Sequence, residues 1–291
     1  MEFEIINSGA NPPFSPMIDE TKLVVIHNAG FFSNSSIALQ DIMIYYKNHG
    51  RLPDIVDRSI QYAFYKSDTV SDLVPFYFDE KSFEIGELPY TENDDYQIAM
   101  NPVAITFQEN IDPQYSDYKQ LDFNSMKPFI KKYFTPSEGV NSWELYLTEG
   151  NNIDFENTCA VFYRGNDKNR ETQCANYYDF ISQATKIEKK NPGIRFLVMP
   201  DEAEFMNTFK DNFPNSFTFH ELPAMKKKDS ANFLELPMSE RAEYGKKFFA
   251  AVLIMAKCKY LVTHSGNGGL WSVIYRGNAE NVYQFLNGKW I

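Results

Sequence analysis

An arginine that directly follows a strand-like segment is the first residue of this sequence whose position suggests chemistry. Val161, Phe162 and Tyr163 form a short apolar run bounded by polar residues, which is typical of a buried parallel strand. Arg164 comes next and opens a polar segment that extends to Thr172. Open α/β sheets bind ligands at the carboxyl ends of their strands. We therefore expect the planar guanidinium of Arg164 to bind a phosphate or pyrophosphate through two hydrogen bonds.

The polar segment after Arg164 has two interpretations. In the first, Asp167 and Lys168 orient the arginine or contact the ligand themselves. In the second, the segment is an ordinary solvated loop, since surface loops are polar in most proteins. These residues alone support the two interpretations about equally.

A second segment whose residues suit ligand binding reads YLVTHSGNGGLWSVIY, from Tyr260 to Tyr275. Glycines at a strand-to-helix turn allow backbone amides to approach an anion at the helix N-terminus. The segment matches neither the Walker pattern nor the dinucleotide pattern, and its glycines could simply close a tight turn. The residues that we predict to bind phosphate here are Ser265, Gly266, Asn267, Gly268 and Gly269.

Three of the four histidines follow strand-like segments. His27 and His264 each lie beside a glycine-containing loop, and His220 ends the run SFTFH. Histidines in this position could contact the phosphate, ribose or base of a nucleotide. The alternative is that they are packed or capping residues, which is the commoner role of a single histidine.

The elements that position these residues alternate between strand and helix patterns, which predicts an α/β protein with parallel sheets. We expect two Rossmann-like domains that face a central cleft: residues 1–150, with a helical connection at about 126–150 broken at Pro136 and Gly139, and residues 151–291. The expected strands are 22–26, 59–65, 99–107, 159–163, 195–199, 216–219 and 260–263. The expected helices are 36–47, 174–190, 202–212, 240–257 and 268–276.

The composition limits the classes of partner. The 291 residues carry a net charge of -11, which argues against nucleic acid and anionic membranes as partners. Neither a signal peptide nor an apolar run of membrane-spanning length is visible. The three cysteines are widely spaced, which favours reduced thiols in a cytoplasm, or in the host cytoplasm if the protein is viral.

With these two motifs, the second half resembles the donor domain of the GT-B, metal-independent, inverting fucosyltransferase superfamily, which includes α1,2-, α1,6- and protein O-fucosyltransferases. The resemblance spans about 157–278. In α1,6-type members a strand precedes Arg-Arg-x-Asp-Lys, and Arg164, Asp167 and Lys168 match this motif, while Gly165 replaces the second arginine. The segment YLVTHSGNGGLWSVIY is similar to the final motif of the family, with Ser265 on its serine.

Two further segments share this resemblance. RFLVMPDEAEFMNTFKDNFP is similar to a strand, acidic turn and helix of the family, with Asp201 in the turn. HNAGFFSN resembles its glycine-containing first loop. The residues of this loop that we assign to the site are His27, Asn28, Gly30 and Asn34.

The resemblance implies transfer of a sugar from a nucleotide diphosphate sugar to a glycan hydroxyl, with inversion. Arginine, and no metal or other cofactor, would neutralise the leaving pyrophosphate. The expected donor is GDP-fucose, with UDP-xylose or another GDP-sugar as alternatives. Two other classes stay open: a non-catalytic nucleotide-sugar or glycan-binding protein, and a sugar-nucleotide oxidoreductase or epimerase, for which HNAGFFSN is a poor glycine fingerprint.

Inverting transfer requires a base that takes the proton of the acceptor hydroxyl. Asp68 and Asp72 follow the expected strand 59–65, so we expect one of them to face the acceptor. Asp41 lies on the helix after the first loop and is less well placed. The alternative for each is a solvated surface carboxylate, since the chain has 39 acidic residues.

Overall fold

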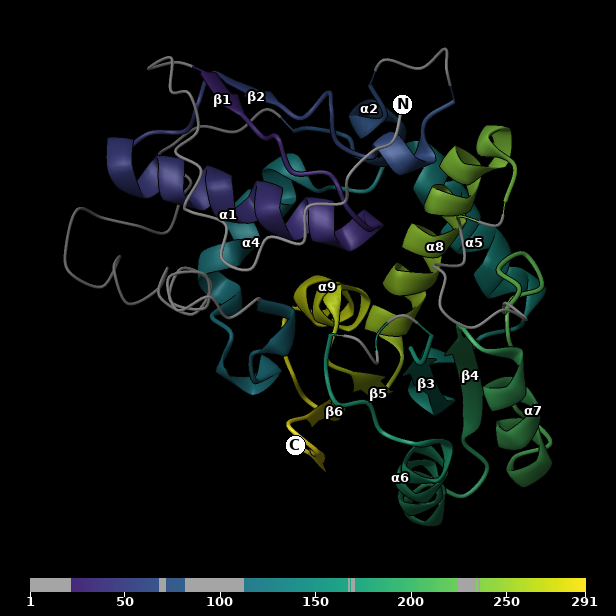
Figure 1. Cartoon of the computed structure of the whole chain (residues 1–291). Helices are drawn as coiled ribbons and strands as arrows, with labels where there is room; N and C mark the ends of the chain where they lie inside the picture. Colours follow the sequence, from purple (N-terminus) through teal and green to yellow (C-terminus); the bar gives the residue numbers. More distant parts are fainter. Residues whose placement is uncertain are drawn as a thin grey trace.

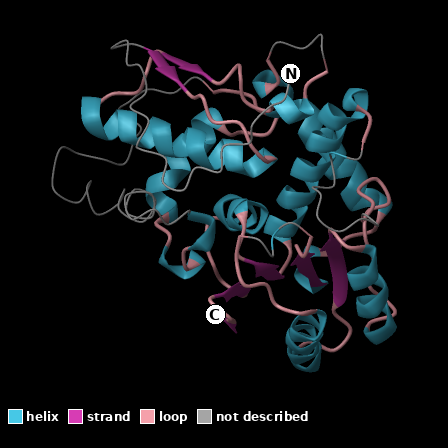
Figure 2. Ribbon diagram, viewed as in Figure 1, coloured by secondary structure: helices cyan, strands magenta, loops and turns pink. Residues whose placement is uncertain are grey.

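The structure of the chain is a computed structural model (Figure 1) that describes residues 22–67, 72–81, 113–166, 168, 171–224, 234 and 236–291. These residues form helices and two sheets of mainly parallel strands (Figure 2), which confirms the predicted α/β class. The predicted strand at 99–107 lies outside the described residues. Among the described helices, none combines the length and apolar character needed to cross a bilayer.

The larger sheet lies in the second half of the chain. Its strands are β3 (Thr158–Tyr163), β4 (Arg195–Pro200), β5 (Tyr260–His264), β6 (Val282–Leu286) and β7 (Lys289–Trp290). They are arranged in the order β4-β3-β5-β6-β7, with β7 antiparallel to β6 and all other pairs parallel. Every residue of the interior strand β3 is buried, as expected for a parallel strand covered on both faces. The carboxyl ends of β3, β4 and β5 therefore meet at one edge.

Helices cover both faces of this sheet. They are α6 (Tyr177–Lys190), α7 (Ala203–Asn212), α8 (Met238–Lys257) and α9 (Asn267–Arg276). In Figure 1, α6 and α7 lie on one side of the sheet and α8 and α9 on the other. Successive side chains of β3 point to opposite faces, so Val161 belongs to the cluster with α6 and α7, and Phe162 to the cluster with α8 and α9. The predicted helices in this half are confirmed, with small shifts of their ends.

Local signals explain where two of these helices begin and end. Asn176 and Asp179 form a capping box at the start of α6, and Gly277 ends α9 with a φ of 74°, a conformation that favours glycine. The predicted strand at 216–219 is wrong in extent, because only Phe217 bridges to Leu197 before the chain turns at His220.

The first half of the chain contains a small parallel sheet and a long helix. β1 (Lys22–Val24) pairs with β2 (Ile55–Asp57), and α1 (Phe31–His49) connects them. The other helices among the described residues are α2 (Val74–Tyr77), α4 (Phe123–Tyr133) and α5 (Glu138–Gly150), with 3-10 helices η1 (Ala63–Tyr65), η3 (Pro113–Tyr115), η4 (Tyr118–Gln120) and η5 (Phe155–Asn157).

The predicted strand at 59–65 is wrong. Residues 59–62 form a turn that leads into η1. Asp57 accepts hydrogen bonds from the backbone and hydroxyl of Ser59, which is a turn-forming arrangement, and Tyr62 adopts a left-handed φ of 62° that no strand residue has. The strand of this region is β2, just before the turn.

The predicted helical connection at 126–150 corresponds to α4 and α5. The break lies at 134–137, around Pro136, where Ser137 caps α5 by accepting a hydrogen bond from Val140 N. Gly139, which we expected to break the helix, lies inside α5 and leaves room for the side chain of Lys246, whose Nζ would lie 3.0 Å from an added Cβ.

Aromatic side chains join the start of α1 to α8 and α9. The ring of Phe32 stacks on Trp271 at 5.6 Å, and Phe31 lies 5.7 Å from Phe249. The hydroxyl of Ser36 accepts a hydrogen bond of 2.9 Å from Trp271 Nε1. One hydrophobic cluster consequently runs through both halves of the chain and brings the N-terminus of α1 close to that of α9.

Asp41 lies within α1 and is partly buried, with no hydrogen bond to another described residue. Burial raises the pKa of its carboxyl to about 7. The folded chain therefore holds a proton between about pH 4 and pH 7 that the unfolded chain has released, so stability falls as the pH rises through this range.

We expect Asp41→Asn to flatten this pH dependence and to be more stable than the wild type at pH 8. The substitution removes a carboxyl whose deprotonation lowers the free energy of unfolding by at most about 1.4 kcal/mol per pH unit. Urea unfolding between pH 4 and pH 8 measures the effect. The exposed Asp54→Asn serves as the control and should follow the wild type. A wild-type slope in the Asp41 variant would contradict the assignment.

Candidate functional site

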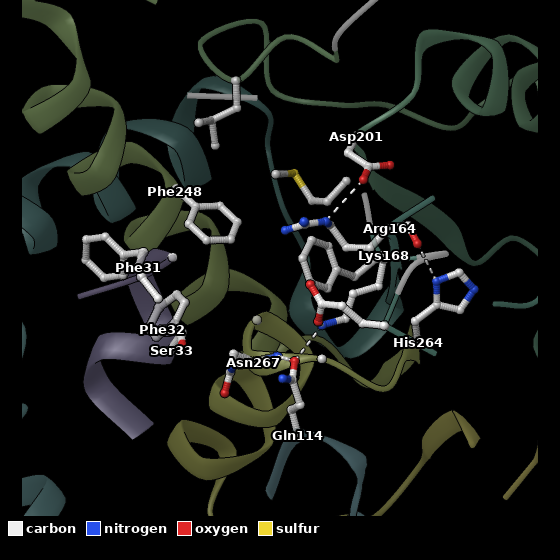
Figure 3. Close-up of a pocket in the computed structure, with 18 of the residues that line it drawn as sticks. Phe31, Phe32, Ser33, Gln114, Arg164, Lys168, Asp201, Phe248, His264 and Asn267 are labelled. Carbon is white, nitrogen blue, oxygen red and sulfur yellow. Dashed lines mark hydrogen bonds and ion pairs between the residues drawn. The ribbon is translucent and has the colours of Figure 1, made fainter. Parts of the chain in front are cut away.

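A cavity of about 300 Å³ lies at the carboxyl edge of the larger sheet, between the N-termini of α1 and α9 and the face of α8 (Figure 3). Its volume is at the lower end of the range for small-molecule sites. Phe31, Phe32 and Phe248 lie on one side of the cavity, and Arg164, Lys168 and Asp201 lie on the other (Figure 3). The aromatic residues are Phe31, Phe32, Phe64, Tyr65, Phe162, Tyr244 and Phe248; the main polar ones are Gln114, Arg164, Lys168, Glu171, Asp201 and Asn267.

Arg164 extends from the end of β3 into the cavity, towards the ring of Phe248 (Figure 3). Its Nε donates a hydrogen bond of 3.1 Å to Asp201 Oδ2, at the end of β4. The buried Asp201 carboxylate also accepts hydrogen bonds from the backbone N–H of Gly165, at 2.8 and 3.1 Å. This contact fixes the direction of the guanidinium, because Arg164 and its loop share one anchor.

Gly165 is required by this packing. A Cβ at this position would overlap the side chains of Glu202 and Tyr163. The replacement of the second arginine of the family motif by glycine is consistent with the close approach of this backbone to β4.

His264, at the end of β5, holds the same loop from the other side. Its Nδ1 lies 2.8 Å from the carbonyl oxygen of Arg164, and its Nε2 accepts a hydrogen bond of 3.1 Å from Ala175 N. The proton must therefore be on Nδ1. Burial lowers the pKa of His264 to about 4, so the ring is neutral at physiological pH. Both ring nitrogens are bonded to the backbone, so His264 positions Arg164. The predicted contact between His264 and a ligand stays a prediction.

Lys168 contributes the second cation of the cavity. Its side chain is buried, and its Nζ donates hydrogen bonds to Gln114 Oε1 at 2.6 Å and to Glu171 Oε2 at 2.5 Å. The hydroxyl of Tyr115 donates to the same oxygen of Glu171, at 2.7 Å. Glu171 is partly exposed, so one side of this carboxylate faces solvent.

The loop before α9 is bonded to other parts of the chain. Ser265 donates its hydroxyl hydrogen to the carbonyl of Phe285, at 2.8 Å. The N–H of Gly266 donates to the hydroxyl of Tyr118 and the N–H of Asn267 to Gln114 Oε1, at 3.0 and 3.2 Å. The amides that we predicted to bind phosphate lie at the cavity, but the N–H groups of Gly266 and Asn267 already donate hydrogen bonds to side chains of this chain.

The other two glycines of this loop have packing roles. A Cβ on Gly268 would lie 2.6 Å from a ring carbon of Phe162, and one on Gly269 would lie 3.0 Å from the carbonyl oxygen of His264. Both positions bring α9 close to the sheet. Gly268 also lines the cavity.

Of the four residues predicted in the first loop, Gly30 lines the cavity and the other three do not. Asn34 is buried and closes the loop, since its side chain accepts a hydrogen bond from Ala29 N and donates one to Ala29 O. His27 Nε2 lies 3.0 Å from Ser33 Oγ, and Asn28 accepts a hydrogen bond from Ala63 N.

His220 and Asp72 are described, and neither lines the cavity. His220 is exposed. Asp72 accepts a hydrogen bond of 2.8 Å from Val74 N, next to α2. Asp68 and Asp167 lie outside the described residues. Their assigned roles stay predictions.

Sequence reasoning missed Gln114, Glu171 and Phe248. The spacing of Lys168 and Glu171, three residues apart, indicates an ion pair and could have identified the glutamate. Phe248 and Tyr244 lie one helical turn apart on α8, but this spacing is also typical of a core helix. Nothing in the sequence indicates that Gln114 reaches the site, because its position depends on how η3 packs against α9.

Comparison with known proteins finds similarity in structure alone. No protein-family model matches the sequence, and no curated protein is similar to it at a significant level. The structure of the fucosyltransferase NodZ from Bradyrhizobium aligns with a TM-score of 0.56 and 10% identity, over 93% of this chain and 97% of that chain.

NodZ α-1,6-fucosyltransferase co-crystallised with GDP, and the same enzyme soaked with GDP-fucose, align over the same shares, with TM-scores of 0.55 and 0.53 and identities of 11% and 10%. At this identity the likeness concerns the fold. The chain has the GT-B-like α/β fold of these fucosyltransferases, which confirms at the level of the fold the resemblance that its motifs indicated.

We expect Asp201→Asn to destabilise the protein by about 1–3 kcal/mol, because one of its terminal atoms would become a donor that faces the N–H of Gly165 or Nε of Arg164. Urea unfolding at neutral pH measures this loss. Asp211→Asn, on the exposed side of α7, should stay within about 0.5 kcal/mol of the wild type. Equal stability of the two variants would show that Asp201 does not anchor the loop.

Proposed function

We propose that this protein transfers a sugar, fucose in the first instance, from a nucleotide diphosphate sugar to a glycan hydroxyl, with inversion and without a metal ion. The observation that carries the proposal is the position of Arg164. It is anchored by Asp201 and directed into an aromatic-walled cavity at the carboxyl edge of the sheet, where α/β folds bind nucleotides.

Departure of a diphosphate requires cations at the position where negative charge develops. Arg164 and Lys168 both line the cavity and offer N–H donors from the same side of the sheet. A guanidinium can bind two phosphate oxygens at once, and an ammonium adds a compact charge. In a partly enclosed site such prearranged donors stabilise the transition state strongly. These two residues can therefore do the work that a divalent metal does in other transferases.

The fold supports GDP-fucose as the first donor to test, because structures with this fold were obtained with GDP and GDP-fucose. The aromatic wall provides stacking surfaces for a base or a sugar. Another GDP-sugar or UDP-xylose remains an alternative donor.

Glu171 is the best-placed base among the described residues. Of the described residues, two carboxylates line the cavity, Asp201 and Glu171. Asp201 is buried and accepts hydrogen bonds from Arg164 and Gly165. Glu171 is partly exposed and is held through one oxygen by Lys168 and Tyr115. It can accept the proton of an acceptor hydroxyl while that oxygen attacks the anomeric carbon and the diphosphate leaves from the opposite face.

Two other classes of function would use the same cavity differently. A non-catalytic protein would bind the donor without transferring its sugar. An oxidoreductase or epimerase would bind NAD, for which the first loop lacks the glycine pattern. Binding and turnover measurements with the same ligands distinguish these classes.

We expect one nucleoside diphosphate among GDP, UDP, CDP and dTDP, with GDP as the first candidate, to raise the thermal unfolding midpoint, with or without EDTA. A ligand at ~100 times its dissociation constant stabilises by about 2.7 kcal/mol. NAD is the control ligand. The shift should disappear in Arg164→Ala and persist in Arg51→Ala, an arginine that does not line the cavity. A shift with NAD alone, or one that requires a metal, would contradict the proposal.

We expect Glu171→Gln to lower kcat by about 10²–10⁴ while the Kd for the diphosphate stays within a few fold, because the amide cannot accept the proton. Transfer from GDP-fucose to a panel of oligosaccharides provides the assay, and the product's anomeric configuration reports inversion. Asp72→Asn is the matched comparison and should keep near-normal turnover. Loss of turnover in Asp72→Asn, with normal turnover in Glu171→Gln, would assign the base to Asp72.

A further inference from the structure

Gln114 reaches the cavity from η3, a segment distant in sequence from the strands that form the site. Its side chain is buried, and its Oε1 accepts two hydrogen bonds: one of 2.6 Å from Lys168 Nζ and one of 3.2 Å from the backbone N–H of Asn267. Figure 3 shows Gln114 next to Asn267, with its amide directed towards Lys168. A cationic group and the first amide of α9 thus converge on one oxygen atom.

This set of donors suits a phosphate oxygen better than an amide oxygen. An ammonium group and an N–H at a helix N-terminus both favour negative charge. A hydrogen bond with one ionised partner is about twice as strong as a neutral one, so the bond from Asn267 N–H would gain strength with a phosphate oxygen as its acceptor. The amide oxygen of Gln114 is neutral. It accepts hydrogen bonds from both donors, but it is a weaker acceptor than a phosphate oxygen.

The backbone around Gln114 is held independently of its side chain. Tyr118 donates a hydrogen bond to the carbonyl of Gln114, at 3.1 Å, and its hydroxyl also contacts Gly266. Gln284 holds the same segment through Ser116 O and Tyr118 N, at 2.8 and 3.0 Å. A change in the side-chain rotamer of Gln114 therefore needs no movement of η3.

We propose that Gln114 Oε1 occupies the position of a diphosphate oxygen of the donor and that its side chain turns away when the donor binds. Gln114 then competes with the donor for Lys168 and Asn267 N and thereby sets the donor affinity. The proposal rests on the proposed function, since it assumes a diphosphate ligand in this cavity.

The alternative role for Gln114 is to hold Lys168 in a binding conformation. The two roles predict opposite effects on diphosphate binding when the side chain of Gln114 is removed. If Gln114 competes, a variant without its amide binds the diphosphate more tightly. If Gln114 positions Lys168, the same variant binds it more weakly.

The experiment measures dissociation constants by isothermal titration calorimetry for GDP and for inorganic pyrophosphate, which contains no base. We expect Gln114→Ala to lower both constants about tenfold, which corresponds to about 1.4 kcal/mol. Gln114→Glu has the same shape but places a carboxylate beside Lys168, so it should raise both constants by tenfold or more. Guanosine, which has no phosphate, should show neither change.

Gln120→Ala is the matched control, because Gln120 is an exposed glutamine of the neighbouring η4 and does not line the cavity. It should bind both ligands like the wild type. If Gln114→Ala does not fold, as judged by its unfolding midpoint, Gln114→Asn provides the same test, since its shorter side chain withdraws the oxygen from Lys168.

If the wild type binds GDP and pyrophosphate and Gln114→Ala binds them equally or more weakly than the wild type, Gln114 does not compete with the donor. The proposed diphosphate site would then still stand. Failure of the wild type and of all variants to bind either probe would instead overturn the diphosphate site, and the role of Gln114 with it. The two failures are distinguished by the wild-type titration.

Discussion

The carboxylate of Asp201 is the interaction on which the polar side of the cavity depends. It joins the end of β4 to the loop after β3, because it accepts hydrogen bonds from Gly165 N and from Arg164 Nε. A buried carboxylate is stable only when its oxygens are bonded in this way. The loop supplies the hydrogen-bond donors that the buried Asp201 carboxylate needs. In return, these hydrogen bonds fix the conformation of the loop and the direction of the Arg164 side chain.

The neutral ring of His264 completes this arrangement from β5. A charged imidazole at the same place would add a third positive charge beside Arg164 and Lys168, and burial disfavours it. Each of the two cations has an acidic partner, Asp201 for the arginine and Glu171 for the lysine. A chain with a net charge of -11 can in this way keep two cations at the cavity, because the four charges of these two pairs sum to zero.

The aromatic contact between the two halves of the chain has a similar role for the apolar side of the cavity. Phe31 and Phe32 open α1 and pack against α8 and α9, so the first loop, Gly30 included, is placed opposite Arg164. η3 reaches the same place through Tyr118 and Gln114. The site is therefore built from segments far apart in the sequence, and residues of the first half decide how much room the ligand has.

The sequence by itself determined β3, β4, β5 and the four helices of the second half, and the residues at their ends. Strand 159–163, the arginine after it and the glycine loop before the last helix are local patterns, since burial on both faces and tight turns each demand particular residue types. The same local reasoning failed at 59–65, where apolar and aromatic residues suggested a strand but Asp57 and Tyr62 form a turn. It also gave no indication of the last two strands, β6 and β7, whose place in the sheet comes from pairing with β5 and with each other.

Only the tertiary structure decided which of the predicted residues meet a ligand cavity and which support it. His264 and Ser265 follow a strand as expected, but their hydrogen bonds go to the backbone, and this depends on neighbours more than 15 residues away, such as Phe285 at a separation of 20. Glu171 and Gln114 come together through Lys168, although 54 residues separate Gln114 from it. No local pattern encodes such a contact, because it arises from the packing of η3 against the N-terminus of α9.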